Sequence, residues 1–357
     1  MATESAGMTR VNHEKLIRFV RRSFERLGVP PSDAEIAANV LIASDLRGVD
    51  THGVIRFNPH GWYVKWLQNG SMTAKPNIRI VTENASTALL DADNGLGMVA
   101  GHRAMEIAIK KAKESGVGIV TVRNSRHYGM SAYYSMLALP HDMIGIAMTN
   151  ASRQVVPTFG RDPRFGTNPI CFAVPAEHER PFVLDMATNT AAAGKLELAV
   201  RLGKAIPLGW ALNEKAQPTA DPKIAQQARR LLPLGGSREG GSHKGYGLGV
   251  LVEILCGVLS GTITALNSNS EPRGHCFGAI DPSAFRPVQE FKSDMDQLIR
   301  ELKSTPPVEG EQRVYVAGEI EFELAEEQTE RGIPLHSSVL KGLREVSEQV
   351  GVPYDLE

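Results

Sequence analysis

The sequence predicts an α/β fold in which the helices at both ends of the chain could form one helical unit. Three observations support this prediction. Residues 11–68 contain amphipathic stretches with the period of an α-helix. From Asn77 onward, short β-rich runs alternate with helical segments, as in an α/β domain. Helical periodicity returns in residues 288–350, and a chain of 357 residues is long enough for about two domains.

The N-terminal segment is predicted to contain three helices. The first covers residues 11–27, where one apolar stripe is formed by Leu16, Phe19, Val20, Phe24 and Leu27. The second follows a turn and a capping box at residues 30–35 and ends near Arg47 and Gly48. The third covers Trp62–Gln68, and a change of character after Ser71 closes the unit.

The middle of the chain is predicted to form the sheet. The expected strands are residues 78–81, 87–90, 118–122, 144–148, 171–174 and 182–184, with a helix at 98–114. A surface excursion rich in glycine, proline and polar residues is expected at 216–241, before a buried helix at 246–259. The C-terminal part predicts a helix at 288–303, a brief strand at 314–316 and a closing helix at 337–350, which could pack on the N-terminal helices.

The composition argues against several classes of function. Lys and Arg number 39 against 40 Asp and Glu, and a net charge of −1 provides no field for nucleic acid or an anionic membrane surface. Because neither a signal peptide nor a run of about 18 apolar residues is evident, we expect a soluble, cytoplasmic protein. The three cysteines lack CxxC spacing and the ten histidines lack HExxH spacing, so we predict reduced thiols and no catalytic metal.

Two glycine-rich segments could contact a nucleotide. Residues 89–101 are similar to a dinucleotide fingerprint, but their spacing is GxGxxxG and the next strand ends in Arg123-Asn124 instead of an acidic residue. A plain turn and helix start is therefore favoured there. Residues 235–247 open into an apolar helix, where backbone amides and Lys244 could hold a phosphate. A solvated loop explains the second segment equally well, and no Walker pattern indicates an ATP site.

The segment 47–56 contains a candidate acid/base. His52 can exchange the hydroxyl proton of an alcohol if its pKa lies near neutrality. Arg56, four residues further on, could grip a carboxylate through two parallel hydrogen bonds. Together these two side chains are the minimum needed to handle a 2-hydroxy acid. Taken alone, the segment is explained more simply by a capping histidine and a surface arginine.

Two further polar side chains follow predicted strands. His127 lies where a strand ends and a loop begins, which is a usual place for functional side chains, and it is a rival catalyst. Asp185 ends an apolar run, where a buried carboxylate needs a partner such as an imidazolium or backbone amides. A helix or turn cap is an equally good interpretation of Asp185.

In their order along the chain, these segments resemble the malate/L-lactate dehydrogenase family of the second type. This family includes sulfolactate and ureidoglycolate dehydrogenases, diketogulonate reductase and piperideine-2-carboxylate reductase. The resemblance runs nearly end to end and is carried by residues 45–53, 166–169, 184–188, 232–236, 241–247 and 318–321. Thr51 stands where the family usually has serine, a change that keeps the hydroxyl and adds a methyl group.

The resemblance implies a nicotinamide-binding α/β domain that is not a Rossmann fold and has a mixed, largely antiparallel sheet. This domain would cover residues 73–299. Residues 1–72 and 300–357 would form a discontinuous helical domain for substrate binding and dimerisation. The resemblance also implies a homodimer with its site near domain and subunit boundaries.

The resemblance implies a role for each matching residue. His52 would exchange the proton, Arg56 would clamp the carboxylate and Asp185 would steer the imidazole. Some relatives look as though they use the histidine that matches His127, so the choice between the two histidines stays open. The implied cofactor contacts are Thr149, Asn150, Asp185, Met186, Ala187, Thr188, His243, Lys244, Gly245, Gly318 and Glu319.

The expected activity is hydride transfer between NAD, or alternatively NADP, and C2 of a small 2-hydroxy or 2-oxo acid of the malate or L-lactate type. Reduction of a cyclic imine carboxylate and oxidation of ureidoglycolate are alternatives that use the same chemistry. A different class of alternative is a non-catalytic nucleotide-binding protein that uses residues 235–247.

Overall fold

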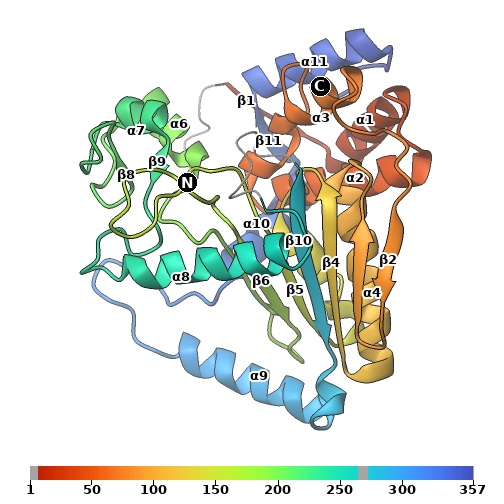
Figure 1. The fold of residues 1–357 in the computed structure, drawn as a ribbon, viewed down its shortest axis with the longest axis vertical. Coiled ribbons are helices and arrows are strands. Elements are labelled where there is room, and N and C mark those ends of the chain that lie inside the picture. The colour runs from red at the N-terminus through yellow and green to blue at the C-terminus, as the bar shows by residue number, and fades with distance from the viewer. Residues whose placement is uncertain (1–6, 264–271, 357) are drawn as a thin grey trace.

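A seven-stranded sheet forms the centre of the molecule, and helices cover both of its faces (Figure 1). The computed structural model describes residues 7–263 and 272–356. In the order of their hydrogen bonding, the strands are β2 (Arg79–Glu83), β3 (Thr87–Asp91), β4 (Val117–Ser125), β10 (Arg273–Ile280), β5 (Ile144–Thr149), β6 (Ile170–Val174) and β7 (Phe182–Met186).

The pairing within the sheet is mixed and largely antiparallel, as expected. Only β3 and β4 run parallel, connected by α4 (Gly97–Ser115), and all other neighbouring strands are antiparallel. A Rossmann domain has a mostly parallel sheet, so this is a different fold. The glycines before and within α4 permit close packing: a Cβ atom on Gly97 would lie 2.0 Å from the carbonyl oxygen of Arg126.

Different helices cover the two faces of the sheet. α4 and α5 (Ser131–Met136) pack on one face. α8 (Ser242–Val252) and the π-helix η4 (Glu253–Val258) cross the other face (Figure 1). The inner side of this second pair buries Val252 and Cys256 against the sheet. The sheet is therefore the middle of three layers, and its edge strand β7 stays open to a cavity.

Segments from both chain ends form a helical layer beside the sheet (Figure 1). Its elements are β1 (Met8–Val11), α1 (His13–Arg26), α2 (Pro31–Leu46), α3 (Trp62–Gln68), α10 (Glu319–Arg331), β11 (Ile333–His336) and α11 (Ser337–Val350). β1 pairs with β11, α1 packs on α11, and α10 packs on α2. The C-terminal helices α10 and α11 thus return to the N-terminal ones, as expected for the closing helix.

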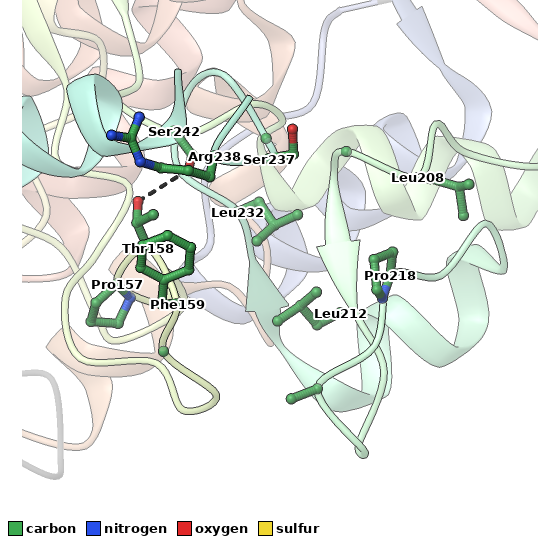
Figure 2. A pocket seen from close by; sticks show the side chains of 14 residues that line it. Pro157, Thr158, Phe159, Leu208, Leu212, Pro218, Leu232, Ser237, Arg238 and Ser242 are labelled. Atoms are coloured by element: carbon green, nitrogen blue, oxygen red, sulfur yellow. Dashed lines mark hydrogen bonds between the residues drawn. The ribbon is translucent and has the colours of Figure 1, made fainter. Parts of the chain in front are cut away.

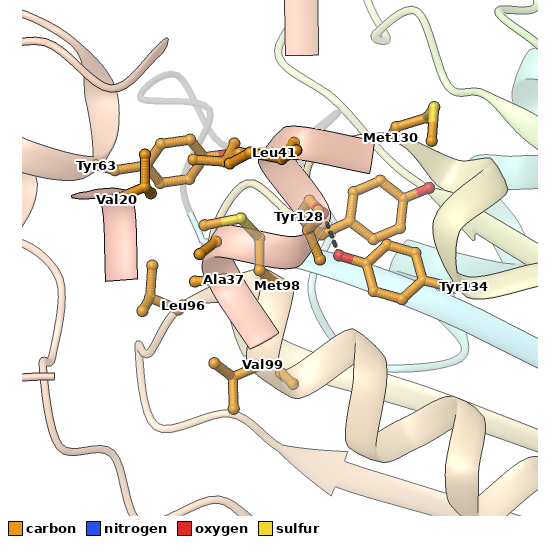
Figure 3. Close-up of a cluster of buried hydrophobic side chains, with 14 of the residues drawn as sticks. Val20, Ala37, Leu41, Tyr63, Leu96, Met98, Val99, Tyr128, Met130 and Tyr134 are labelled. Carbon is orange, nitrogen blue, oxygen red and sulfur yellow. Dashed lines mark hydrogen bonds between the residues drawn. The ribbon is translucent and has the colours of Figure 1, made fainter. Parts of the chain in front are cut away.

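One apolar core joins this helical layer to the sheet. Figure 3 shows Val20 of α1, Leu41 of α2 and Tyr63 of α3 in the same cluster as Met98 of α4 and Tyr134 of α5. The loops that connect these elements are therefore anchored both to the helical layer and to the helices packed on the sheet. The domain boundaries expected after residues 72 and 299 stay a prediction.

Several local predictions are wrong. The excursion expected at residues 216–241 contains α7 (Pro222–Ala228) and β9 (Arg230–Leu231), which pairs with β8 (Ala211–Leu212). Residues 314–316 are not a strand, because Val316 uses its backbone to close the turn before α10: its N–H donates to the Glu319 carboxylate and its carbonyl accepts from the Glu319 N–H. α6 (Ala193–Leu202) and α9 (Val288–Lys303) complete the main helices.

The start of α2 also differs from the expectation. Its N-cap is Pro30, which makes no side-chain capping bond. Asp33 instead accepts a hydrogen bond from Arg103 at 2.6 Å, which ties the first turn of α2 to α4. No helix in residues 7–263 or 272–356 is long and apolar enough to cross a membrane.

Candidate active site

A cavity of about 830 Å³ opens at the edge of the sheet beside β7. Asp185 and Met186 line it from the end of β7, Ser131 and Ala132 from the start of α5, and His52 from the segment after α2. Cofactor sites are commonly cavities of about 300–1,000 Å³. The cavity therefore has the size and the mixture of polar and apolar walls that a cofactor with its substrate needs.

Two 3-10 turns after α2 carry His52 and Arg56: η1 (Asp50–His52) and η2 (Val54–Arg56). The buried carboxylate of Asp45 holds them, since its Oδ2 accepts the Val54 N–H at 2.9 Å. Burial raises the pKa of Asp45 well above its ordinary value. Gly53 is required between the turns, because a Cβ atom there would lie 1.7 Å from Oδ1 of Asp45.

His52 is neutral at physiological pH. Its Nδ1 lies 2.9 Å from the Thr51 hydroxyl. Burial, together with the positive charges of Arg56 and Arg273, lowers the pKa of His52 to about 4. A neutral imidazole can accept a proton, so His52 is able to act as a general base.

Arg56 is oriented by two contacts. Its Nε donates to the carbonyl oxygen of Thr51 at 2.8 Å, and its guanidinium carbon lies 4.6 Å from the ring centre of Trp62. Among the described residues, its two terminal nitrogens have no hydrogen-bond partner. They form the fork that binds a carboxylate through two parallel hydrogen bonds.

His127 lies beside His52, so the structure brings both candidate histidines together. The two rings stack with centroids 5.6 Å apart. His127 Nδ1 lies 2.6 Å from the hydroxyl of Tyr63 and 3.2 Å from the backbone nitrogen of Gly129. Burial is the main cause that lowers the pKa of His127 well below its ordinary value.

Arg273 is a buried, charged residue near both histidines that the sequence did not reveal. It is the first residue of β10, its side chain is buried, and its charge lowers the pKa of both His52 and His127. The site therefore has two cations, Arg56 and Arg273, around two neutral imidazoles. No sequence pattern pointed to Arg273, because the strand that carries it was not predicted.

Asp185 lies in the cavity wall, and one of its carboxylate oxygens is hydrogen-bonded to the protein backbone. Its Oδ2 accepts the Ala132 N–H at 2.8 Å. The residue is exposed to the cavity, and desolvation by the surrounding protein raises the pKa of its carboxyl group to about 6. No hydrogen bond joins Asp185 to His52 in the part of the chain that the structure describes; the imidazole contacts Thr51 instead.

Two buried polar atoms in the cavity residues have no partner among the described residues: Nε of Arg47 and Oδ1 of Asn189. Buried polar groups in proteins nearly always have a hydrogen-bond partner, so these atoms fit a polar ligand. Met186, Ala187 and Gly318 line the same cavity. The chemistry of this wall fits the amide end of a nicotinamide cofactor.

The other predicted cofactor residues lie outside this lining. Thr149 and Asn150 are buried with internal partners, His275 and the carbonyl of Thr262. Thr188 is buried behind the wall, where its N–H donates to Thr167. Glu319 points away into ion pairs, with the ammonium group of Lys303 at 3.2 Å. These assignments stay predictions.

A second cavity, of about 410 Å³, lies beside the glycine-rich loop (Figure 2). Arg238 and Ser242 line it, and Phe159 and Leu208 add apolar surface. The predicted contacts in this loop lie in the first turn of α8: His243 and Lys244 are exposed, and Gly245 is buried. Leu234 lines the first cavity and Gly236 the second, so the loop connects the two.

Across residues 7–263 and 272–356, no group of three or more His, Cys, Asp or Glu side chains could hold a metal ion. The three cysteines are free and buried. Burial raises the pKa of each thiol, which makes these cysteines poor nucleophiles. The reactive groups of the site are therefore its histidines, arginines and Asp185.

Comparisons with known proteins place the whole chain among dehydrogenases. A family model described as malate/L-lactate dehydrogenase matches residues 11–344. The malate dehydrogenase of Pyrococcus horikoshii is 44% identical over 349 residues, and the L-sulfolactate dehydrogenase of Methanocaldococcus jannaschii is 40% identical over 347, each covering 96% of both chains. The crystal structure of malate dehydrogenase from Entamoeba histolytica matches with a TM-score of 0.93 at 35% identity, covering 98% of this chain and 100% of that one.

Proposed function

Because this chain belongs to the malate/L-lactate dehydrogenase family and is an oxidoreductase of 2-hydroxyacids, we propose that His52 is its acid/base and that Arg56 and Arg273 hold the substrate. One observation carries this proposal. His52, in the wall of the large cavity, is kept neutral by burial and by two nearby guanidinium groups, which also attract an anionic acid.

The chemistry follows from the charge states. A nicotinamide dinucleotide, when bound, accepts or donates the hydride. In oxidation, the substrate loses a hydride from C2 and a proton from its hydroxyl group, which His52 takes up, and a 2-oxo acid is left. In reduction, protonated His52 returns the proton to the forming alkoxide. The carboxylate of the bound acid offsets the charge of Arg56 and so raises the pKa of His52 from about 4 toward its ordinary value.

Arg56 fixes the geometry of the reaction. The Thr51 carbonyl and the Trp62 ring hold its guanidinium, and the free fork binds the C1 carboxylate. Positioning of this kind can lower a barrier by several kcal/mol. Substitution of Arg56 by Lys keeps the charge and loses the fork, so we expect KM for the hydroxyacid to rise at least tenfold with a smaller change in kcat.

Arg273 favours a substrate with a second anionic group. Its guanidinium is a second buried cation whose charge reaches both histidines, and it would attract a second anionic group on the substrate. Malate and sulfolactate each carry a carboxylate or sulfonate at the far end. A substrate panel followed by nicotinamide absorbance tests this: Arg273→Met should lower kcat/KM for malate more than for lactate, and an equal loss for both would contradict it.

The same panel separates the alternatives. Cyclic imine carboxylates and ureidoglycolate also carry a carboxylate that Arg56 could bind. If kcat/KM for either compound exceeds that for malate, that compound replaces malate as the proposed substrate. A non-catalytic nucleotide-binding protein would bind cofactor without any substrate-dependent change in absorbance. The position of His52 in the cavity wall, with Arg56 hydrogen-bonded to the neighbouring Thr51, supports catalysis.

We propose NAD as the cofactor, with NADP as the alternative, within a family of NAD(P)-dependent dehydrogenases. The nicotinamide would lie against Asp185, Met186 and Ala187, and the loop with Lys244 would carry the phosphates toward the second cavity. Arg238 beside that cavity would suit the extra phosphate of NADP. Steady-state kinetics with NAD and with NADP decide between the two cofactors. Arg238→Ala should raise KM for NADP and leave KM for NAD unchanged.

Two further proposals concern assembly and location. The outer face of α8 and η4 exposes Leu251, Ile254 and Val258 by 45–55%, which is a large apolar stripe for a surface helix. We propose that two copies bury this stripe in a homodimer. Leu251→Glu should then give monomers in light scattering, whereas an unchanged mass would exclude this face.

The free buried cysteines support a cytoplasmic location, which cell fractionation tests.

The assignment of the acid/base is tested by replacing each histidine. His52→Ala should lower kcat by about 10²–10⁴, the usual contribution of a general acid or base. Turnover that stays within tenfold of the native enzyme would show that another group exchanges the proton, and His127→Ala in the same assay would identify it. Cofactor binding, measured by fluorescence, should be retained in both variants.

A further inference from the structure

The two neighbours of His127 Nδ1 determine which ring nitrogen carries the proton. The backbone N–H of Gly129 donates to Nδ1 at 3.2 Å. The hydroxyl group of Tyr63 lies 2.6 Å from the same atom. A backbone N–H can only donate, so Nδ1 must be the bare nitrogen, and a neutral imidazole then carries its proton on Nε2.

Both neighbours are held firmly. Tyr63 is completely buried in α3, and its hydroxyl can donate to Nδ1 alongside Gly129. Gly129 has φ +79°, in the left-handed region, and a Cβ atom there would lie 2.5 Å from Cγ1 of Val40. The turn that aims the N–H at His127 therefore requires glycine.

The surroundings of His127 also disfavour a second proton. An imidazolium would direct Nδ1–H against the N–H of Gly129. The titratable and charged groups that face the ring are His52 from η1, Arg56 from η2, Tyr63 from α3, and Arg273 and His275 from β10. Four of these are cationic or become so on protonation, and together with burial they lower the pKa of His127.

We propose that His127 stays neutral throughout turnover and donates its Nε2 proton as a hydrogen bond to the C2 oxygen of the substrate, with Tyr63 as the positioning residue that maintains this tautomer. The inference rests on the proposed function, because His52 then exchanges the proton. Among the described residues, Nε2 of His127 has no hydrogen-bond partner. The ring of His127 stacks on that of His52 with centroids 5.6 Å apart, which places it next to the proposed acid/base.

The tautomer is measured directly in the native enzyme. With ¹⁵N-labelled histidine, NMR distinguishes a protonated from a bare ring nitrogen, and the spectrum of His127→Gln identifies the signals of His127. We expect a protonated Nε2 and a bare Nδ1 that do not titrate across the neutral range, with or without bound cofactor. A protonated Nδ1, or titration near neutrality, would overturn the proposal whatever the role of His52.

Matched glutamine variants separate donation from proton exchange. Glutamine can donate a hydrogen bond from the place of Nε2 but cannot exchange a proton at these pH values. His127→Gln should lower kcat by about tenfold to a hundredfold, as expected for one hydrogen bond to a charged oxygen. His52→Gln should lower it by about 10²–10⁴ and abolish the acidic limb of the pH profile.

The outcomes of this pair distinguish the two proposals. If His127→Gln costs more than His52→Gln and abolishes the acidic limb, His127 exchanges the proton and the inference is wrong. If His52→Gln stays within tenfold of native while the NMR tautomer is as expected, the proposed role of His52 fails and the tautomer assignment survives.

Tyr63 is tested by removal of its hydroxyl group alone. Tyr63→Phe should lower kcat severalfold, leave KM nearly unchanged, and produce a minor Nδ1-protonated population in the NMR spectrum. Tyr133→Phe is the matched control, because it removes a tyrosine contact with His102, at 3.3 Å, away from the cavity lining. Equal effects of both variants, or a Tyr63→Phe tautomer identical to native, would refute the positioning role.

Discussion

The two histidines of the site differ in what their Nδ1 atoms contact. His52 contacts the hydroxyl group of Thr51, which can donate or accept, whereas His127 contacts a backbone N–H that can only donate. His52 can therefore gain and lose a proton without losing its contact. The threonine methyl group is accommodated by Gly194, since a Cβ atom there would lie 2.6 Å from it. Thr51 thus contacts His52 through a hydroxyl group that suits either protonation state of the ring, and it packs on Gly194 through its methyl group.

The pH profile of hydroxyacid oxidation should report His52. Neutral His52 is the active form, so we expect kcat/KM to fall only as the pH drops through its pKa of about 4. Arg56→Gln removes a positive charge that lowers this pKa, and the acidic limb should move to higher pH while kcat/KM falls overall. Steady-state kinetics at saturating cofactor measure both changes.

Arg126→Gln is the control for this prediction. Arg126 also lies over a tryptophan ring, that of Trp66, but it is not among the charges that lower the pKa of His52. Its removal should leave the limb in place. A limb that moves equally in both variants, or that moves down in Arg56→Gln, would contradict the assignment to His52.

At the scale of elements, the pair of 3-10 turns depends on one buried carboxylate. Asp45, at the end of α2, caps the N–H of Val54 and fills the space that a side chain at position 53 would need. Asp45 thereby fixes the turns that carry His52 and Arg56. In the first turn of α3, Trp62 packs against the Arg56 guanidinium and Tyr63 contacts His127. Three short elements, η1, η2 and α3, therefore position His52, Arg56 and His127, and none of these three residues lies in an α-helix or a β-strand.

Gly53→Ala should disturb both stability and catalysis. The new methyl group would overlap the Asp45 carboxylate, and overpacking of this kind typically costs about 1–3 kcal/mol of unfolding free energy. We expect a lower Tm and a fall in kcat of at least tenfold, measured by thermal denaturation and steady-state assay. Gly247→Ala, at an exposed position of α8 where nothing lies within 4 Å of the new Cβ atom, should leave the Tm nearly unchanged. Native values for Gly53→Ala would show that Asp45 does not brace the turns.

The sequence indicated site residues that lie together in one short segment. It missed those that are distant in sequence and meet only in the fold. His52 and Arg56 share one short segment, and a resemblance promoted them over a simpler interpretation. Arg273 could not be found, because β10 contains Gly274 and Gly278 and therefore lacks the side-chain signature of a central strand. At Gly278 a Cβ atom would lie 3.0 Å from Cδ1 of Ile119, so a larger residue would fit tightly there. The support by Tyr63 is also invisible in sequence, since 64 residues separate it from His127.

On the scale of the whole molecule, the helical layer that carries His52 is closed by the C-terminal segments. β1 pairs with β11 from Met8↔His336 to Val11↔Ile333, and α11 packs on α1. Arg10 adds hydrogen bonds to the carbonyl of Gly332 and to Glu327. The site-bearing layer is therefore complete only when both chain ends are in place.

Deletion of residues 1–11 should weaken this closure. It removes the strand pairing of β1 and the buried side chain of Val11, which together should cost about 2–4 kcal/mol of unfolding free energy. Denaturant unfolding measures the loss. Deletion of residues 1–6 keeps β1 and serves as the control. Equal stability of the two truncated proteins would show that β1 does not contribute.

The pairing of β1 with β11 also imposes an order on biosynthesis. Almost the whole chain separates Met8 from its partner His336. At about 5–20 residues per second, a ribosome needs on the order of tens of seconds between producing the two strands. During this time the nascent chain exposes the inner faces of α1 and α2 and holds His52 in an unfinished layer. The layer that carries His52 can therefore be completed only after β11 and α11 have been synthesised.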